Sequence, residues 1–370
     1  MRPMIPWLAL TLGLAACQTD RPTAASSTAD LTSGKEGALR VYTQNLYIGA
    51  DVDKVIAAPP AQLPSALFQA LATFVATDYP SRAGRIADEI GRQNPDLIGL
   101  QEVTHLTVQG LGIVGFPDID VDFIPILSAQ LAARGLQYDV VAVSPNTDIT
   151  IPLPLPDGSI GVIALKDFDA ILVRHGIATG NVVTKNYQAK FSTSLGPIPL
   201  DILRGYAAAD VTVRGRNYRF VTTHPEPRGT GLSIQAAQAE ELISDLAGTT
   251  LPLIVVGDFN SKPSAPETEA PYNQMLAAGF LDTWTRRNSE PGDGPTCCQI
   301  EDLTNPVSVH TQRIDFVFVK NPSAPAGPLG GPVQIKLFGD GAEEKTSNGL
   351  WPSDHAGVFE TLRVAAERVD

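Results

Sequence analysis

Eight short runs of apolar and β-branched residues, each bounded by polar or turn-forming residues, constrain the fold of this chain more than any other feature. They are Leu39–Leu46, Leu97–Glu102, Ala170–Arg174, Ala207–Val213, Tyr218–His224, Leu253–Asp258, Ile314–Lys320 and Gly357–Val364. Runs of this length predict buried strands. Helical patterns separate some of them, and close neighbours such as 207–213 and 218–224 indicate hairpins. We therefore predict an α/β fold with mixed rather than purely parallel sheets.

Three segments between these runs have helical patterns. Residues 81–93 place four apolar residues on one face, and Asn94-Pro95 ends the helix; the four are Ala83, Ile86, Ala87 and Ile90. A second helix is predicted between Gly231 and Gly248, and a weaker one over about Pro64–Ala76. No repeat or change of composition follows residue 38, so residues 39–370 are predicted to form one domain.

The composition allows a large core and an acidic surface. The chain has 370 residues, of which 43% are hydrophobic, and its formal net charge is −13. An acidic surface disfavours loose attraction to nucleic acid or to anionic membranes, although a local cationic cleft is compatible with it. Carboxylate-rich sites are also typical of bound divalent cations.

The N-terminus has the pattern of an export signal. Residues 1–17 contain one basic residue, an apolar stretch and then small residues before Cys17. The sequence LAAC resembles the lipobox of bacterial lipoproteins, in which cleavage leaves the cysteine as a lipidated N-terminus; an ordinary secretory peptide is the alternative. Residues 18–38 lack periodicity and indicate a flexible tether. We expect an exported protein of the bacterial cell envelope, held at a membrane through Cys17.

Polar side chains of a few chemical types stand where the predicted strands give way to loops. Each has an ordinary explanation by itself, since Gly-Asp-x-Asn is a favourable turn and Ser-Asp can cap a helix. As a set they would converge if the strands share one end of the sheets. The set consists of Asn45, Glu102, His224, Asp258, Asn260, Asp315, Asp354 and His355.

These residue types suit hydrolysis of a phosphate ester. Glu102, with Asn45 and Asp354, offers the oxygen ligands that Mg²⁺ prefers, and the metal would polarise a phosphoryl oxygen. Asp258 would orient or deprotonate a water, and Asn260, two residues on, would donate to the same phosphate.

The ordered series TQN, LQE, TTH, GDFN, RIDFVF and SDH resembles the endonuclease/exonuclease/phosphatase superfamily over about residues 39–365. The resemblance implies a four-layered α/β sandwich, with two mixed β-sheets packed face to face and helices outside. It also implies phosphoester hydrolysis dependent on Mg²⁺ or Mn²⁺. By motif, Glu102 would ligate the metal with Asn45 and Asp354 assisting, and Asp258 would activate water. Asn260 and His224 would hold the phosphate, with the His355–Asp315 pair beside them.

Three further expectations follow from the same resemblance. Arg204 matches an Arg-Gly-aromatic segment and is a candidate phosphate contact, the alternative being a surface salt bridge. Asp167 or Asp169 could orient His224. Gln235 and Gln238 stand where many relatives have an Arg-x-x-Gln pattern, a minor departure.

Adjacent Cys297 and Cys298 leave two alternatives, a strained vicinal disulfide or two packed thiols. A zinc site is disfavoured, because the sequence has no second pair of Cys or His residues at ligand spacing. The 56 residues between Asn45 and Glu102 suggest an inserted helical hairpin. Residues 106–164 could form a lipid-facing wall; the alternative is a packed lid or a β-hairpin with no role in substrate binding.

Three functions remain open from the sequence. The first is a surface-tethered, monomeric phosphodiesterase acting on nucleic acid or a phospholipid headgroup. The second is a phosphomonoesterase of the inositol-phosphatase type, which would need more cationic residues near the motifs than Arg204, Arg228 and Lys262. The third is a catalytically silent binding module.

Overall fold

A computed structural model describes residues 38–263, 270–286, 294–322 and 329–364 of the chain. The predicted leader, the tether and the lipidation site Cys17 lie outside the described residues. Among the described residues, no helix combines the length and the apolar character needed to cross a membrane.

The first sheet is mixed and has seven strands. Its order is β14-β15-β1-β2-β5-β4, and β3 pairs with β2. Strands β1 and β2 are parallel, and the other pairs are antiparallel. The strands are β1 Ala38–Asn45, β2 Leu97–Gln109, β3 Ile119–Asp122, β4 Tyr138–Pro154, β5 Ile160–Arg174, β14 Leu329–Phe338 and β15 Gly357–Val364.

The second sheet is also mixed, with the order β12-β13-β11-β10-β9-β6. Strands β10 and β11 are its parallel pair. Its members are β6 Ala178–Asn186, β9 Gly205–Val213, β10 Arg216–Thr223, β11 Leu253–Asp258, β12 Leu281–Asp282 and β13 Asp315–Lys320. A separate hairpin joins β7 Phe191–Leu195 to β8 Ile198–Ile202.

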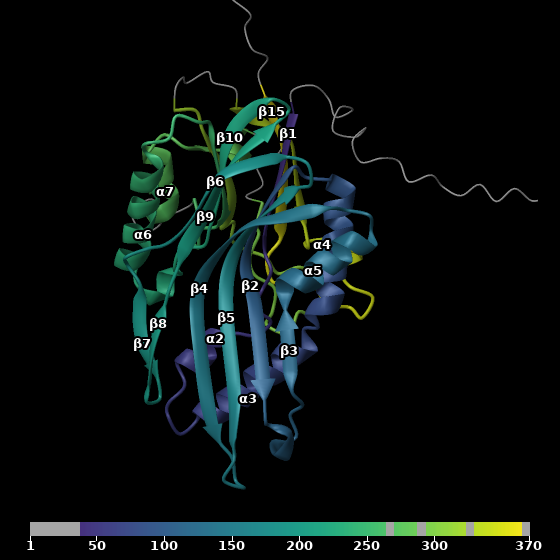
Figure 1. Ribbon diagram of the computed structural model, residues 1–370, viewed down its shortest axis with the longest axis vertical. Coiled ribbons are helices and arrows are strands. Elements are labelled where there is room, and N and C mark those ends of the chain that lie inside the picture. The colour runs from purple at the N-terminus through teal and green to yellow at the C-terminus, as the bar shows by residue number, and fades with distance from the viewer. Residues whose placement is uncertain (1–37, 264–269, 287–293, 323–328, 365–370) are drawn as a thin grey trace, which may run out of the picture. The chain divides into compact units, whose positions relative to one another are not determined.

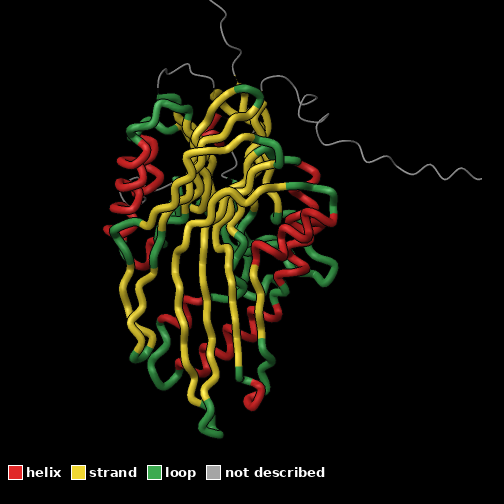
Figure 2. The backbone as a smooth tube through the Cα atoms, viewed as in Figure 1, coloured by secondary structure: helices red, strands yellow, loops and turns green. Residues whose placement is uncertain are grey.

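Helices cover the outer face of each sheet, as Figures 1 and 2 show. The first sheet carries α2 Val52–Ile56, α3 Leu63–Ala76, α4 Tyr79–Gln93 and α5 Phe123–Ala133. The second carries α6 Leu232–Leu246 and α7 Ala270–Ala277. Short 3₁₀ turns lie at Gly112–Val114, Arg228–Thr230, Thr283–Arg286 and Ala342–Glu344.

Three apolar clusters separate the four layers. On β11, Ile254 and Val256 face the first sheet, whereas Leu253 and Val255 face α6 and α7. This alternation has the period of two expected for a strand buried on both faces. A third cluster lies between the first sheet and its helices. The predicted four-layered sandwich is confirmed.

Polar side chains are embedded between the two sheets at two places. The buried amide Nε2 of Gln101 on β2 donates to Thr222 Oγ1 on β10 at 2.8 Å, directly linking the sheets. Beside it Gly99 allows a close approach, because a Cβ there would lie 2.5 Å from Val256 Cγ2. Further along, the carboxyl of Glu360 on β15 points into the inter-sheet core and accepts a hydrogen bond from Thr283 Oγ1 at 2.7 Å.

The structure contains more elements than the sequence patterns predicted. All eight predicted runs are strands, and all three predicted helices are present. Residues 45–102 hold α2, α3 and α4 rather than a two-helix hairpin. Residues 106–164 form the end of β2, then β3 and α5, and then β4 with the start of β5 as a long antiparallel hairpin. A β-hairpin is therefore present in that segment.

Candidate active site

The predicted site residues come together where strands of both sheets end. Asn45 and Asp258 are the last residues of β1 and β11, and His224 directly follows β10. Asp315 begins β13 and pairs with Asp258 across the antiparallel ladder, while Asp354 and His355 precede β15. Parallel strands place their carboxyl ends at one edge, and antiparallel neighbours begin there. This topology converts residues far apart in sequence into one cluster.

Backbone distortions aim two of these side chains. Glu102 lies at an irregularity in the β2–β5 pairing between Leu100 and Val103, and its φ is +52°. Asn260, just beyond β11, has a φ of +48°. β-Bulges redirect side chains beside active sites, and non-glycine residues in the left-handed region are held there by their surroundings. The part of β2 around Glu102 therefore leaves the regular ladder beside the site, and the pairing with β5 resumes at Val103.

Asn45 connects the two sheets through its side-chain amide. Its Nδ2 donates to Glu102 Oε1 at 3.0 Å and to Asp258 Oδ2 at 3.2 Å. Its oxygen accepts from the backbone N–H of Tyr47 at 2.9 Å. The second oxygen of Glu102 accepts from the N–H of Ile48 at 2.8 Å, so both carboxylate oxygens have a fixed direction.

His355 is paired with a buried carboxylate. Its Nδ1 lies 2.9 Å from Asp315 Oδ2, and its Nε2 faces Asp258 Oδ2 at 3.7 Å. Burial would lower the pKa of His355, but the carboxylates of Asp315, Asp258 and Asp354 outweigh burial and raise it well above its ordinary value. His355 is therefore an imidazolium whose Nδ1–H donates to Asp315 and whose Nε2–H points toward Asp258.

His224 has the opposite charge state. Burial and the nearby Arg204 guanidinium lower the pKa of His224 well below its ordinary value, so the ring is neutral. Arg204 Nη1 lies 3.0 Å from His224 Nδ1, and the amide nitrogen of Asn260 lies 3.0 Å from His224 Nε2; both neighbours are donors, and the neutral ring accepts from one of them only. That Nε2 lies 3.4 Å from Asp258 Oδ2 and 3.0 Å from the Asn260 amide.

Asp258 is the point on which these groups converge. Oδ1 accepts from the N–H of Asn260 at 2.8 Å, while Oδ2 faces Asn45 and both histidines. Burial raises the pKa of Asp258 to about 7, although His355 opposes the shift. A carboxylate with a pKa near neutrality is suited to accept a proton from water.

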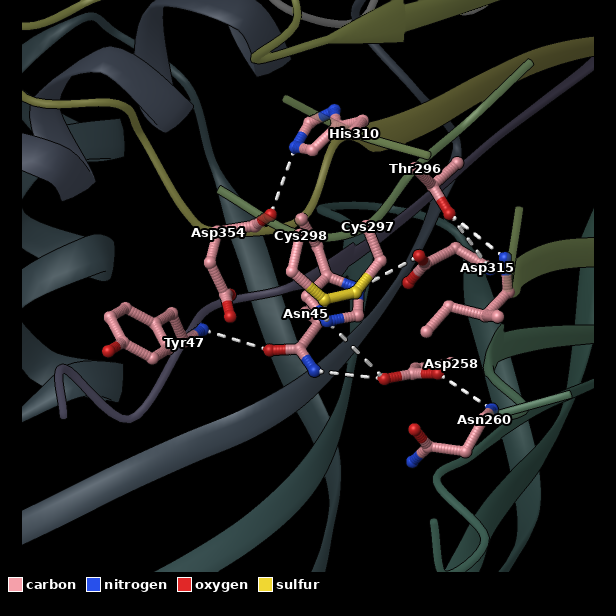
Figure 3. Close-up of a disulfide and its surroundings, with 12 residues drawn as sticks. Asn45, Tyr47, Asp258, Asn260, Thr296, Cys297, Cys298, His310, Asp315 and Asp354 are labelled. Atoms are coloured by element: carbon pink, nitrogen blue, oxygen red, sulfur yellow. Dashed lines mark hydrogen bonds and ion pairs between the residues drawn. A yellow bond between two sulfur atoms is a disulfide. The ribbon is translucent and has the colours of Figure 1, made fainter. Parts of the chain in front are cut away.

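A disulfide between Cys297 and Cys298 lies against this cluster, drawn in Figure 3 among Asn45, Asp258, Asp315 and Asp354. The structure thus has the disulfide rather than two free thiols. Cys298 Sγ lies 3.8 Å from His355 Nε2. Thr296, the preceding residue, accepts hydrogen bonds through Oγ1 from the backbone N–H groups of Ile314 and Asp315, at 3.1 and 3.2 Å. Neither contact could be predicted from the sequence, because residues 296–298 match no catalytic motif.

The structure corrects two expectations about the surroundings of His224. Asp167 and Asp169 do not orient it: both oxygens of Asp169 are buried without a hydrogen-bond partner, and Asp167 accepts from Asn146. Instead Arg204 contacts His224. Arg204 is also no surface salt bridge, because its 2.6 Å pair with Glu226 is almost completely buried at the glutamate and 15% exposed at the arginine.

The two glutamines of α6 support the site from behind. Gln235 Nε2 donates to the carbonyl of Asn260 at 2.8 Å. Gln238 Oε1 accepts from the N–H of Glu226 at 2.7 Å. Although the sequence departs from the Arg-x-x-Gln pattern, Gln235 therefore positions Asn260, and Gln238 positions Glu226, the ion-pair partner of Arg204.

The donor set at Glu102 fits a hard divalent cation. Glu102 and half-buried Asp354 supply carboxylate oxygens, the ligand type that Mg²⁺ prefers; desolvation raises the pKa of Asp354 to about 7, and the Glu102 carboxylate adds to the increase. Asn45 turns its Nδ2 toward Glu102, so it orients that carboxylate in this structure. A second group, Asp258, Asp315 and His355, has ligand atoms within 4.8 Å of one another; there His355 would ligate a cation only after losing a ring proton, and its Nδ1 lies 2.9 Å from Asp315 Oδ2.

Comparison with solved structures identifies the same fold. A Leptotrichia buccalis endonuclease/exonuclease/phosphatase family protein matches with a TM-score of 0.53 and 18% identity, over 88% of this chain and 99% of that chain. Humanized D. rerio TDP2 matches with a TM-score of 0.51 and 16% identity over the same shares. D. rerio TDP2 complexed with single strand DNA product matches with a TM-score of 0.50 and 16% identity, again over 88% and 99%. At these identities the likeness concerns the fold alone.

Comparison by sequence gives the family. No curated protein matches the chain. The model of the Endonuclease/Exonuclease/phosphatase family matches residues 72–355, which include all the predicted site residues except Asn45 and Cys17. Members of this family are phosphoesterase hydrolases. The chain belongs to the Endonuclease/Exonuclease/phosphatase family.

Proposed function

We propose that this protein is a Mg²⁺-dependent phosphodiester hydrolase. The observation that supports this most is the surroundings of Asp258 Oδ2, which faces a neutral histidine at 3.4 Å and a protonated one at 3.7 Å. A proton acceptor between a neutral donor and a cation is the arrangement needed to activate water beside an anionic phosphate.

Each residue has a defined task in this proposal. Asp258 accepts the proton of the attacking water. Its two carboxylate oxygens are held in place by hydrogen bonds from Asn45 and from the backbone N–H of Asn260, and they fix the direction from which the water attacks. The His224 ring and the Asn260 amide donate to phosphoryl oxygens. His355 offsets the negative charge that develops on the phosphate, and Asp315 keeps its ring oriented and charged.

A bound Mg²⁺, held by Glu102 and Asp354, would polarise a phosphoryl oxygen and offset charge on the leaving oxygen. Asn45 orients Glu102 for this task through its 3.0 Å hydrogen bond. Mn²⁺ has the same preference for oxygen ligands and could replace Mg²⁺.

We further propose that the protein works outside the cytoplasm, attached to a membrane through lipidated Cys17. The leader pattern of residues 1–17 and the disulfide beside the site support this, because disulfides persist in oxidising compartments. Labelling with a radioactive fatty acid in wild-type and Cys17→Ser cells tests the attachment; equal labelling of the two would contradict it.

The activity is tested with chromogenic esters. The full chain carrying Cys17→Ser, which cannot be lipidated, is assayed on bis(p-nitrophenyl) phosphate and on p-nitrophenyl phosphate, with Mg²⁺ and with EDTA. We expect diester turnover that EDTA abolishes. Asp258→Ala should lower kcat about 10²- to 10⁴-fold, the usual contribution of a general base.

The matched control is Asp139→Ala, an exposed aspartate paired with His175. It should leave turnover unchanged. Preference for the monoester would favour the phosphomonoesterase, and absence of turnover on both esters would favour the silent binding module. Full diester activity in Asp258→Ala would refute the assignment of the site.

A further inference from the structure

A cavity beside the active site is lined almost entirely by apolar side chains. Its volume is about 140 Å³. It lies between the helices α2 and α3, the outer face of β2, β4 and β5, and the β7–β8 hairpin. Six of the residues that form its wall are Leu67, Leu71, Phe74, Ile151, Ile163 and Leu200. A cavity of about 150 Å³ with this kind of wall remains dry and binds benzene.

The charged residues of the lining gather around Arg204. Glu226 pairs with its guanidinium at 2.6 Å, and Asp167 and Asp53 both interact with it electrostatically. The rest of the wall offers no comparable group, apart from the hydroxyl of Thr147. The cavity is thus amphipathic, with one polar end and one long apolar end.

The polar end adjoins the candidate catalytic residues. Arg204, which lines the cavity, contacts His224 Nδ1 at 3.0 Å. Ile48 also lines the cavity, and its N–H donates to Glu102 Oε2 at 2.8 Å. A phosphate at the site would therefore lie next to the polar end of this cavity.

We propose that this cavity binds an apolar substituent of the substrate, an alkyl chain esterified to the phosphate that is hydrolysed. This inference rests on the proposed phosphodiesterase function and specifies its substrate class as amphiphilic phosphate esters. An aliphatic wall with a single aromatic ring, Phe74, suits an alkyl chain. A nucleobase would need stacking partners and hydrogen-bond donors or acceptors along the wall.

Binding of product analogues tests the cavity without requiring turnover. Methyl phosphate and butyl phosphate are titrated by calorimetry against the Cys17→Ser chain in the presence of Mg²⁺. Each methylene that leaves water for an apolar cavity should strengthen binding about fourfold, so the three extra methylenes give up to about 60-fold. We expect butyl phosphate to bind at least about tenfold more tightly than methyl phosphate.

A variant that fills the cavity identifies the place of binding. Ala70 on α3 lines the cavity, and Ala70→Leu should reduce the preference for butyl phosphate to less than about threefold, with methyl phosphate binding unchanged. Ala72 on the same helix is exposed, and Ala72→Leu is the control that should keep the full preference.

The outcomes separate the two proposals. If butyl phosphate binds more tightly and Ala70→Leu abolishes this preference, the cavity proposal is supported even when no ester is hydrolysed. In that case only the proposed hydrolase function is contradicted. Equal affinities, or no binding of either ester, overturn the cavity proposal whether or not the chromogenic diester is hydrolysed. If the folded Ala70→Leu variant still prefers butyl phosphate, the alkyl group binds elsewhere, and the cavity proposal is also overturned. If Ala70→Leu does not fold, the comparison of the two esters on the unaltered cavity decides.

Discussion

The carboxyl of Glu360 gives a prediction whose size follows from its position between the sheets. It is 1% exposed, one oxygen accepts from Thr283, and the other has no hydrogen-bond partner. Burial raises the pKa of Glu360 from 4.5 to about 8. Between these values the folded state keeps a proton that the unfolded state has released, so the free energy of unfolding falls as pH rises. The full shift corresponds to about 5 kcal/mol at about 1.36 kcal/mol per unit.

Glu360→Gln removes this titration and keeps an oxygen for Thr283. At pH 5, where Glu360 is protonated in the folded protein, we expect the variant to be up to about 2 kcal/mol less stable, since its amide leaves two buried N–H groups unpaired where the carboxyl leaves one O–H. From pH 5 to pH 9 the difference between the two free energies of unfolding should change in favour of the variant by about 3 to 5 kcal/mol.

Urea unfolding followed by tryptophan fluorescence at pH 5, 7 and 9 measures this difference. Glu240→Gln, at an exposed position of α6, removes the same charge and serves as the control for the net charge of the chain. A difference between Glu360→Gln and wild type that does not grow with pH, or that grows equally in the control, would refute the reasoning.

Three further predictions concern the site and the contact between the sheets. Arg204→Lys keeps the charge but loses the planar fork that joins Glu226 to His224, so kcat/KM on the diester should fall about 10- to 100-fold; wild-type kinetics would contradict its role. Gly99→Ala should lower the free energy of unfolding in urea by about 1 to 3 kcal/mol, whereas Gly248→Ala, with nothing within 4 Å of the new Cβ, should not. Asp315→Asn should lower the pKa of His355, measured by NMR titration, because a carboxylate that raises it is removed; an unchanged pKa would show that Asp258 and Asp354 suffice.

The strands that the sequence predicted are those buried on both faces. Residues 253–258 are all buried, so their apolar run is continuous and its bounds agree with β11. Strand β6 was not predicted, because seven of its nine residues are exposed and it contains no apolar run. In the paired ends of β4 and β5 near the hairpin turn, buried apolar residues alternate with exposed residues and prolines. In the sequence this pattern resembles an irregular loop. Burial on one face only, or on none, leaves a weak signal.

The same limit applies to the candidate site. Residues within motifs at strand ends, such as Asp258 and His355, could be named because their order along the chain is distinctive. Thr296 and Cys298 could not, since their contacts with Asp315 and His355 arise from folding of a loop that has no periodic pattern. The contact of His224 with Arg204 could not be predicted either, because the sequence left open whether Asp167 or Asp169 orients the ring and gave no register for β5.

The order of the strands has a consequence for folding of the protein. Along the described residues the strands begin in the first sheet, pass to the second and return, so that β15 pairs with β1, where Thr43 faces Val358. Until β15 has docked, β1 has an open edge next to a half-built layer, which is a template for aggregation. Asp354 and His355 directly precede β15. Completion of the candidate site and protection of the edge should therefore appear together, and a chain that lacks residues 353–364 should be both inactive and prone to self-association.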